Sequence, residues 1–254
     1  MMDPAELSVV VTGGASGLGE GTVRQVIGQG GKAAIFDMNA ERGAEIAAEL
    51  GERALFCKVD VTSETDVNTA LDQVTDAFGS INGVVNCAGI AIGQKITSRG
   101  EAHPLDKYRK VLDINVTGTF NVMRLATLRM EENAPCVDGA LGAIVNTASV
   151  AAFDGQKGQV AYAASKGAIV ASNLPIARDL ARSGIRINTI APGLFMTPMA
   201  AGLGEEIVTE LSKDIIFPKR FGTPQEYGEL AVFMLTHSYL NGETIRLDGA
   251  IRLP

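Results

Sequence analysis

The chain has 254 residues, of which 22 are Lys or Arg and 29 are Asp or Glu, giving a net charge of −7. With 46% hydrophobic residues it fits a folded globular protein, and its acidic balance argues against a broad nucleic-acid surface, so we expect no nucleic-acid partner. No apolar run approaches the ~20 residues that cross a bilayer, so we expect no membrane partner. Three widely spaced cysteines and only two histidines predict that the chain has no metal site.

The first residues carry no recognisable targeting pattern. Segment 1–6 is acidic and contains no Arg, unlike a secretory signal or a transit peptide. The cysteines form no CxxC pair, which agrees with a reducing compartment. We therefore expect a cytoplasmic protein, with the mitochondrial matrix as the alternative if a targeting segment has been removed.

Short apolar runs alternate with longer amphipathic stretches along the chain. The expected strands are residues 7–12, 33–37, 54–60, 83–86, 143–147, 186–190 and 243–247. The expected helices are residues 17–29, 40–50, 64–78, 105–131, 161–183 and 224–235. This alternation predicts βαβ units in one α/β domain over residues 1–254, a Rossmann-like, doubly wound parallel sheet of seven strands with helices on both faces. A TIM barrel is the competing architecture, but it needs eight similar units and no special first turn.

A glycine-rich turn directly follows the first expected strand. Residues 12–19 read TGGASGLG, with Gly13, Gly17 and Gly19 at the key positions. Glycine lets the backbone approach a bulky anion, and a helix N-terminus presents free N–H groups and a positive dipole end to that anion. A plain tight turn is the alternative, but the position between strand and helix favours a pyrophosphate site. We expect this site to be formed by Gly13, Ser16, Gly17, Leu18 and Gly19.

The second expected strand ends in an acidic residue, Asp37, 18 residues after Gly19. A carboxylate at this place can accept the hydroxyls of the adenosine ribose, and it repels a 2′-phosphate. No Lys or Arg occurs in residues 14–18 to receive such a phosphate, so the sequence favours NAD over NADP. The alternative is that Asp37 caps the following helix, although Asn39 can do so equally well.

The next two strands also end in residues suited to a flat ligand. Asp60 and Val61 end the third strand and are expected at the adenine edge, although Asp60 can instead close a turn with Thr62 and Ser63. At the end of the fourth strand, Asn86, Ala88 and Gly89 leave room for a cofactor that lies across the strand tips.

The clearest sign of catalysis is a tyrosine followed four residues later by a lysine. Tyr162 and Lys166 share one face of the expected helix, where the ammonium is predicted to lower the tyrosine pKa and make a general acid and base. Ser149 lies just past the fifth strand, where its hydroxyl can bind the substrate oxygen. Asn115 lies inside an expected helix, where Asn is unfavourable, and it can hold a water between the backbone and Lys166.

These motifs together resemble the short-chain dehydrogenase/reductase family. The resemblance covers essentially the whole chain and rests on residues 12–19, Asp60, residues 86–89, Asn115, Ser149, Tyr162 with Lys166, and Pro192-Gly193. It implies a nicotinamide cofactor that Tyr162 and Lys166 also contact, and catalysis by Ser149, Tyr162, Lys166 and Asn115. It further implies that Pro192, Gly193, Leu194 and Thr197 hold the nicotinamide. Cys87 departs from the pattern, because most members have a second Asn there.

Longer strings resemble one branch of that family, the type 2 3-hydroxyacyl-CoA dehydrogenases, which includes 17β-hydroxysteroid dehydrogenase activity. They are residues 11–19, 86–91, 118–121, 146–153, 174–180, 189–195 and 240–252. The branch implies NAD-dependent, reversible oxidation of a secondary alcohol on a short or branched acyl-CoA thioester, as in fatty acid metabolism, by a homotetramer built partly on helices 105–131 and 161–183. Two alternatives stay open: a hydroxysteroid or small-alcohol dehydrogenase without CoA recognition, and an NAD-binding scaffold.

Residues 193–223 are expected to form the substrate loop. Its first part holds the apolar residues Leu194, Phe195, Met196, Met199 and Leu203 between Gly and Pro, which is typical of a lid over an apolar substrate. Packing in the core is the alternative for about half of them. Cations for the phosphates of a CoA tail can come from Lys95 and Arg99 in one loop, or from Lys213, Lys219 and Arg220 in the other.

Overall fold

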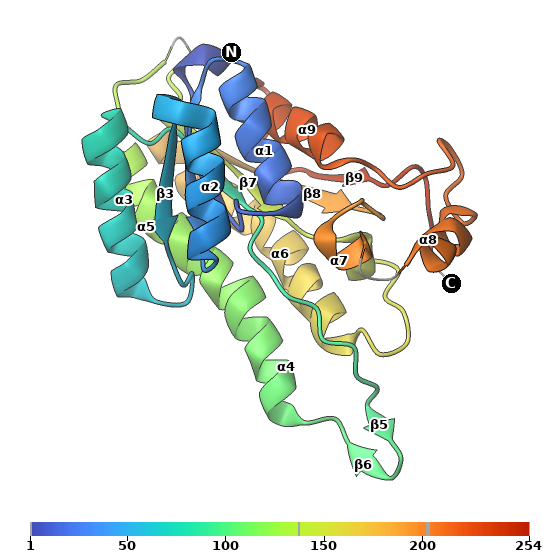
Figure 1. Cartoon of the computed structure of the whole chain (residues 1–254). Helices are drawn as coiled ribbons and strands as arrows, with labels where there is room; N and C mark the ends of the chain where they lie inside the picture. Colours follow the sequence, from blue (N-terminus) through green and yellow to red (C-terminus); the bar gives the residue numbers. More distant parts are fainter. Residues whose placement is uncertain (1, 137, 202–203, 254) are drawn as a thin grey trace.

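The computed structural model describes residues 2–136, 138–201 and 204–253 (Figure 1). Its centre is a seven-stranded sheet in the order β3-β2-β1-β4-β7-β8-β9, and every pair of neighbouring strands is parallel. The strands are β1 Ser8–Thr12, β2 Lys32–Asp37, β3 Ala54–Lys58, β4 Gly83–Asn86, β7 Gly142–Thr147, β8 Ile185–Pro192 and β9 Thr244–Leu247. The chain order reverses direction between β1 and β4, which is where open α/β sheets bind ligands.

Helices cover both faces of this sheet (Figure 1). They are α1 Gly17–Gly28, α2 Ala40–Leu50, α3 Glu64–Phe78, α4 Leu105–Leu112, α5 Thr119–Met130, α6 Val160–Asp179, α7 Pro198–Ala201, α8 Glu205–Ser212 and α9 Pro224–Thr236. Helices α1, α2 and α9 pack on one face, and α3, α5 and α6 on the other. The predicted doubly wound fold is therefore confirmed, and the TIM barrel is excluded.

The buried strands explain why two hydrophobic cores form. All five residues of β1 are buried, and alternate side chains point to opposite faces. Val9 and Val11 join the core under α1 and α9, whereas Val10 joins the core under α3 and α5. A continuous apolar strand of this kind is typical of a sheet covered on both sides.

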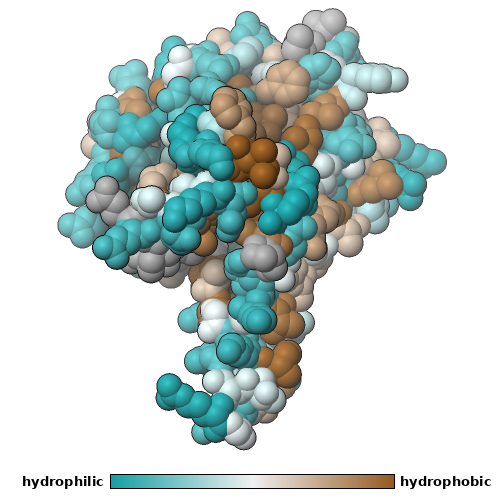
Figure 2. Space-filling model, turned by 90° about the vertical axis from the view of Figure 1, so that its right-hand side faces the viewer, coloured by the Kyte–Doolittle hydropathy of each residue, from teal (hydrophilic) through white to brown (hydrophobic). Residues whose placement is uncertain are grey.

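Three regions differ from the expected elements. The single helix expected over residues 105–131 contains a π-helical turn, Asp113–Gly118, between α4 and α5. The loop after β4 carries a small hairpin, β5 Thr97–Ser98 and β6 Glu101–Ala102. With α4 it forms an arm that projects from the body of the molecule, clearly seen in Figure 2. The substrate loop contains α7 and α8, and Leu203 lies outside the described residues.

Within the described ranges, no helix is long and apolar enough to cross a bilayer. The same residues contain no group of three or more His, Cys, Asp or Glu placed to hold a metal ion. The thiols of Cys57, Cys87 and Cys136 are free.

Candidate active site

The predicted cofactor residues meet at the carboxyl edge of the sheet, around the tips of β1 and β4. Gly13 and Gly17 have positive φ angles of 64° and 52°, which an L side chain rarely adopts. A Cβ on Gly13 would lie 2.9 Å from the Ala88 nitrogen, and one on Gly19 would lie 2.1 Å from the Gly13 oxygen. The turn therefore needs glycine in order to bring α1 against the strand tips.

The N-terminus of α1 fits an anion. Ser16 precedes the helix in an extended conformation, and its side chain makes no capping hydrogen bond to any described residue. The first N–H groups of α1, from Gly17 and Leu18 onward, therefore remain available where the helix dipole is positive. These residues fit the pyrophosphate of a dinucleotide, as the sequence predicts.

Asp37 lies beside this turn, at the end of β2. Its Oδ2 accepts a hydrogen bond from the Ala15 nitrogen at 3.1 Å, and its Oδ1 accepts one from the Asn39 nitrogen at 2.9 Å. Asn39, not Asp37, caps α2, because its side chain accepts from the Arg42 nitrogen at 3.1 Å. The carboxylate is therefore aimed at the glycine-rich turn, and capping does not explain it.

The tips of β3 and β4 are held by their own side chains. Asp60 Oδ1 accepts from the nitrogen and hydroxyl of Thr62 at 2.9 and 2.7 Å. Asp60 therefore closes a turn with Thr62, which was the alternative to an adenine contact. The Val61 side chain lies against Gly118. Asn86 is buried and donates to Asn146 Oδ1 at 2.9 Å, so its amide joins two strands. The adenine contacts of Asp60 and Val61, and the cofactor contact of Asn86, stay predictions.

Tyr162 and Lys166 lie together on α6, as their spacing predicts. The Lys166 Nζ is 5.7 Å from the centre of the Tyr162 ring and donates a hydrogen bond of 2.7 Å to the Thr147 oxygen at the end of β7. Lys166 is buried, with 5% of its surface exposed. The pair therefore lies beside the tip of a central strand.

Burial governs the titration of both groups. It raises the pKa of Tyr162 above its usual range, while a hydrogen bond with the Ser149 side chain acts in the lowering direction. It also lowers the pKa of Lys166 to about 8. In the protein's own groups the net shift of the Tyr162 pKa is therefore upward, against the lowering that the sequence predicts, because burial is its largest cause.

Ser149 lies directly after β7 and begins the one-turn helix Val150–Ala152. Its Oγ accepts from the Ala151 nitrogen at 3.1 Å, and its side chain acts to lower the pKa of Tyr162. Ser149 is 8% exposed, so the hydroxyl is held in a largely dry place where a hydrogen bond to a developing charge is strong.

Asn115 lies in the π-helical turn, a feature that often marks functional positions. Its side chain accepts from the Ile90 nitrogen at 2.8 Å and donates to the Ile90 oxygen at 2.9 Å and to Ser165 Oγ at 3.0 Å. A Cβ on Gly89 would be 3.2 Å from Asn115 Oδ1 and 3.6 Å from Lys166 Nζ. Asn115 thus joins the loop after β4 to α6 beside Lys166, and its part in a proton relay stays a prediction.

The end of β8 closes the site on the other side. Gly193 donates from its nitrogen to the Leu247 oxygen at 2.9 Å, directly after Pro192. Thr197 lies over the glycine-rich turn, since a Cβ on Gly17 would be 3.3 Å from its methyl carbon. The structure therefore brings residues 192–197 to the same edge as β1 and β4. Leu194 packs against the small core of Ile215, Phe221 and Ile251.

Comparisons with known proteins agree with this arrangement. Residues 13–251 match the family model described as enoyl-(acyl carrier protein) reductase, which covers short-chain dehydrogenases. The chain belongs to the short-chain dehydrogenase/reductase family. It is therefore an oxidoreductase that uses a nicotinamide cofactor.

Three relatives are similar over nearly their whole length. The 3-hydroxyacyl-CoA dehydrogenase type-2 of Drosophila melanogaster is 52% identical over 96% of both chains. The Homo sapiens protein of that name is 50% identical, over 97% of this chain and 95% of its own. The crystal structure of 3-hydroxyacyl-CoA dehydrogenase type-2 from Mycobacterium avium superposes with a TM-score of 0.93 at 41% identity, covering 98% of this chain and 96% of that one.

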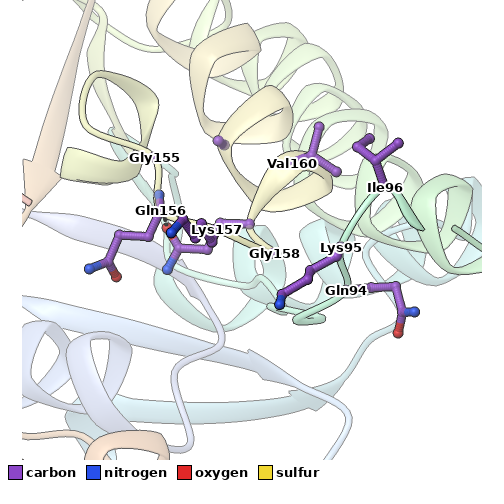
Figure 3. Close-up of a pocket in the computed structure, with 10 residues that line it drawn as sticks. Gln94, Lys95, Ile96, Gly155, Gln156, Lys157, Gly158 and Val160 are labelled. Carbon is purple, nitrogen blue, oxygen red and sulfur yellow. Dashed lines mark hydrogen bonds between the residues drawn. The ribbon is translucent and has the colours of Figure 1, made fainter. Parts of the chain in front are cut away.

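A pocket of about 570 Å³ lies beside the start of α6 in this short-chain dehydrogenase. Residues 94–96, in the loop after β4, line one side, and residues 155–160, before and at the start of α6, line the other (Figure 3). Lys95 extends toward the segment that carries Lys157. Ala163, the residue after Tyr162, also borders this space, so the pocket lies against the first turn of α6, near the tyrosine.

Two of the other expected cations form ion pairs elsewhere. Lys213 pairs with Glu210, and Arg220 pairs with Glu226 at 2.8 Å. Phe195 is buried in the core, whereas Met196 is 42% exposed. Core packing, the alternative to a lid, therefore explains part of the apolar stretch in the substrate loop.

Sequence reasoning missed three residues of this dehydrogenase site. Thr12 Oγ1 accepts from the nitrogens of Cys87 and Ala88 at 3.1 Å each and thereby fixes the tip of β4. Ser165 links Asn115 to the backbone carbonyl oxygen of Tyr162, to which its hydroxyl donates at 2.7 Å. Lys157 faces the pocket from a loop without a motif. Of these, only Thr12 carries a sequence signal, because it precedes the first glycine.

Proposed function

We propose that this dehydrogenase interconverts a 3-hydroxyacyl-CoA and a 3-oxoacyl-CoA with NAD. The observation that carries the proposal is the arrangement of Ser149, Tyr162 and Lys166 beside the cofactor edge, next to a pocket that offers cations from two segments. The relatives named 3-hydroxyacyl-CoA dehydrogenase type-2 support the choice of substrate.

The protein's own groups move the proton of the alcohol. Ser149 orients the substrate oxygen through its hydroxyl, and Tyr162 accepts the hydroxyl proton at its phenolic oxygen during oxidation and returns it during reduction. Lys166 holds the ribose next to the nicotinamide and favours the ionised tyrosine. A bound nicotinamide supplies the hydride acceptor or donor.

The choice of NAD rests on the charge beside the adenosine ribose. Asp37 places a carboxylate against the glycine-rich turn, and a 2′-phosphate there would meet like charge without a cation from residues 14–18. A carboxylate accepts ribose hydroxyls well. We therefore expect NAD to be preferred strongly over NADP.

The pocket suits the phosphates of a CoA tail. Lys95 and Lys157 line the same space from two separate segments. Two ammonium groups that converge from separate segments attract a polyanion more strongly than scattered surface lysines do. The acyl end then reaches Tyr162 along the face of α6.

The test compares oxidation of a short 3-hydroxyacyl-CoA with the same acyl group on N-acetylcysteamine, the matching free acid and a 17β-hydroxysteroid, followed by NADH absorbance. NADP replaces NAD in parallel, and Tyr162→Phe serves as the blank. We expect the CoA thioester and NAD to give the highest kcat/KM. Activity on the steroid alone would refute the thioester assignment and leave the mechanism in place.

Charge variants test the pocket separately. Lys95→Gln and Lys157→Gln should each raise KM for the CoA thioester about two- to fivefold, the size of a solvent-exposed ion pair, without changing kinetics on the N-acetylcysteamine thioester. Lys213→Gln is the matched control, since its ammonium already pairs with Glu210. Equal effects on both thioesters would argue against a phosphate contact.

A further inference from the structure

The turn that follows β9 touches two parts of the active site. On one side, a Cβ on Gly193 would lie 2.8 Å from the Asp248 Cα, so the turn packs directly against the segment expected to hold the nicotinamide. On the other side, the Gly249 oxygen accepts from the nitrogens of Ile216 and Phe217 at 3.1 and 3.2 Å, in the substrate loop. The turn therefore lies between the cofactor segment and the substrate loop.

A single guanidinium joins this turn to a third part of the site. Arg246, in β9, donates from Nε to Asp248 Oδ2 at 2.7 Å and from Nη2 to Asp154 Oδ2 at 2.5 Å. Nη2 also donates to the Ile251 oxygen at 3.0 Å, and the guanidinium lies 5.3 Å from the centre of the Phe153 ring. The side chain is only 21% exposed, so these ion pairs are partly shielded from water.

Asp154 is linked to the catalytic serine through one helical turn. Its nitrogen donates to the Val150 oxygen at 2.8 Å, and the Ala151 nitrogen donates to Ser149 Oγ at 3.1 Å. The Ser149 side chain in turn acts on Tyr162, whose pKa it helps to lower. The short turn Val150–Ala152 therefore lies between Asp154 and the serine hydroxyl.

We propose that Arg246 is a positioning residue for the dehydrogenase reaction. Its two carboxylate partners belong to the segment after Ser149 and to the turn against Gly193, so one planar group sets the separation between the substrate-orienting hydroxyl and the nicotinamide segment. The proposal rests on the roles proposed above for Ser149 and Gly193. A misplacement of about 1 Å at a reacting centre can lower the rate on the order of 100-fold.

The geometry needs an arginine. A guanidinium presents several N–H donors in a rigid fork and can bind two carboxylates at once, whereas a lysine ammonium is one point charge on a flexible stem. Arg246→Lys therefore keeps the charge but holds only one of Asp154 and Asp248 firmly. It serves as the second variant if Arg246→Gln folds poorly.

The first test measures kcat and KM for Arg246→Gln, Arg246→Lys and Asp154→Asn on whichever alcohol the wild-type enzyme oxidises. We expect kcat to fall about 10- to 100-fold, while KM for NAD changes less than about threefold because the adenosine half binds at β1 and β2. Arg252→Gln is the matched control. Arg252 also pairs with Asp248, at 3.0 Å, but its side chain is 60% exposed, and among the described residues it forms no ion pair with Asp154.

Two readouts distinguish positioning from general support of the fold. The double variant with Ser149→Ala and Arg246→Gln should have a kcat within about twofold of that of Ser149→Ala alone, because both changes act through the same hydroxyl. In the wild-type background, a displaced Ser149 side chain no longer lowers the pKa of Tyr162, so the pH of half-maximal oxidation should move upward.

Independent losses in the double variant, or an unmoved pH profile with a lower melting temperature, would overturn the proposal. Full activity of Ser149→Ala would instead refute the proposed role of the serine, and the positioning role with it. If the CoA thioester proves not to be a substrate, the double-variant kinetics and the pH profile can still be measured, because they use any alcohol that the enzyme oxidises.

Discussion

At the scale of single residues, the site is built on buried titratable groups that cost stability. Lys166 is the clearest case, because burial lowers its pKa from 10.5 to about 8. Between these two pH values the folded chain binds fewer protons than the unfolded chain, so this group makes stability rise with pH. Below pH 8 the folded protein bears the full cost of a buried ammonium.

Lys166→Met should therefore raise the melting temperature at pH 7 while it abolishes oxidation. We expect a gain of roughly 2–4 °C, the shift for about 1 kcal/mol in a chain of this size, because lost desolvation exceeds the lost hydrogen bond to Thr147. The gain should shrink at pH 10. Thermal unfolding at both pH values measures it.

Lys95→Met is the control for the previous substitution, since it removes an exposed lysine. Its melting temperature should match that of the wild type at both pH values. A lower melting temperature for Lys166→Met at pH 7 would mean that the contact with Thr147 outweighs desolvation.

At the scale of elements, the cofactor turn depends on a close contact between α1 and α9. Gly21 on α1 is buried, and a Cβ there would lie 2.3 Å from the Pro224 oxygen at the start of α9. The start of α9 is itself fixed by a capping box, in which Thr223 and Glu226 bond each other's backbone nitrogens. An added methyl group at Gly21 would therefore meet a well-fixed backbone at the start of α9.

Gly21→Ala should destabilise the protein by about 1–3 kcal/mol through overpacking, more than the ~1 kcal/mol that alanine gains in helix propensity. Urea unfolding measures the change. Gly28→Ala on the same helix is the control, because its Cβ would meet no described atom within 4 Å. Equal stabilities of the two variants would show that α9 moves aside freely.

At the scale of the whole molecule, large apolar side chains remain exposed on the two helices that the family resemblance assigns to subunit contacts. Phe120 and Leu128 on α5 are 53% and 55% exposed, and Leu174 on α6 is 48% exposed. Small residues such as Ala164 and Ala171 lie on the exposed side of α6. We propose that these faces join copies of the chain into a homotetramer, as complementary apolar surfaces do.

Light scattering after size-exclusion chromatography should then give about four times the 26.6 kDa chain mass. Phe120→Glu should shift the protein to smaller species, because it puts a charge into the contact. Ala48→Glu adds the same charge to an exposed position of α2 and should leave the mass unchanged. A monomeric wild-type protein would refute the assembly.

The alternation of apolar runs was enough to predict the parallel sheet, since strands and helices leave periodic patterns in the chain. The glycine-rich turn and the Tyr162–Lys166 spacing were equally readable, because their chemistry depends on residues close in sequence. Boundaries such as Ala40–Leu50 and Glu64–Phe78 follow directly from capping residues, and the structure has both helices as expected.

Contacts between distant segments left no such pattern. The fold places separate segments side by side, and three features depend on this. They are the bond between Arg246 and Asp154, the pocket that Lys95 and Lys157 share, and the π-helical turn at Asn115. The direction of the Tyr162 pKa shift belongs with them, since it depends on how much solvent the packed chain removes. Local sequence therefore specifies the elements and the reacting groups, while long-range packing sets their distances and charges.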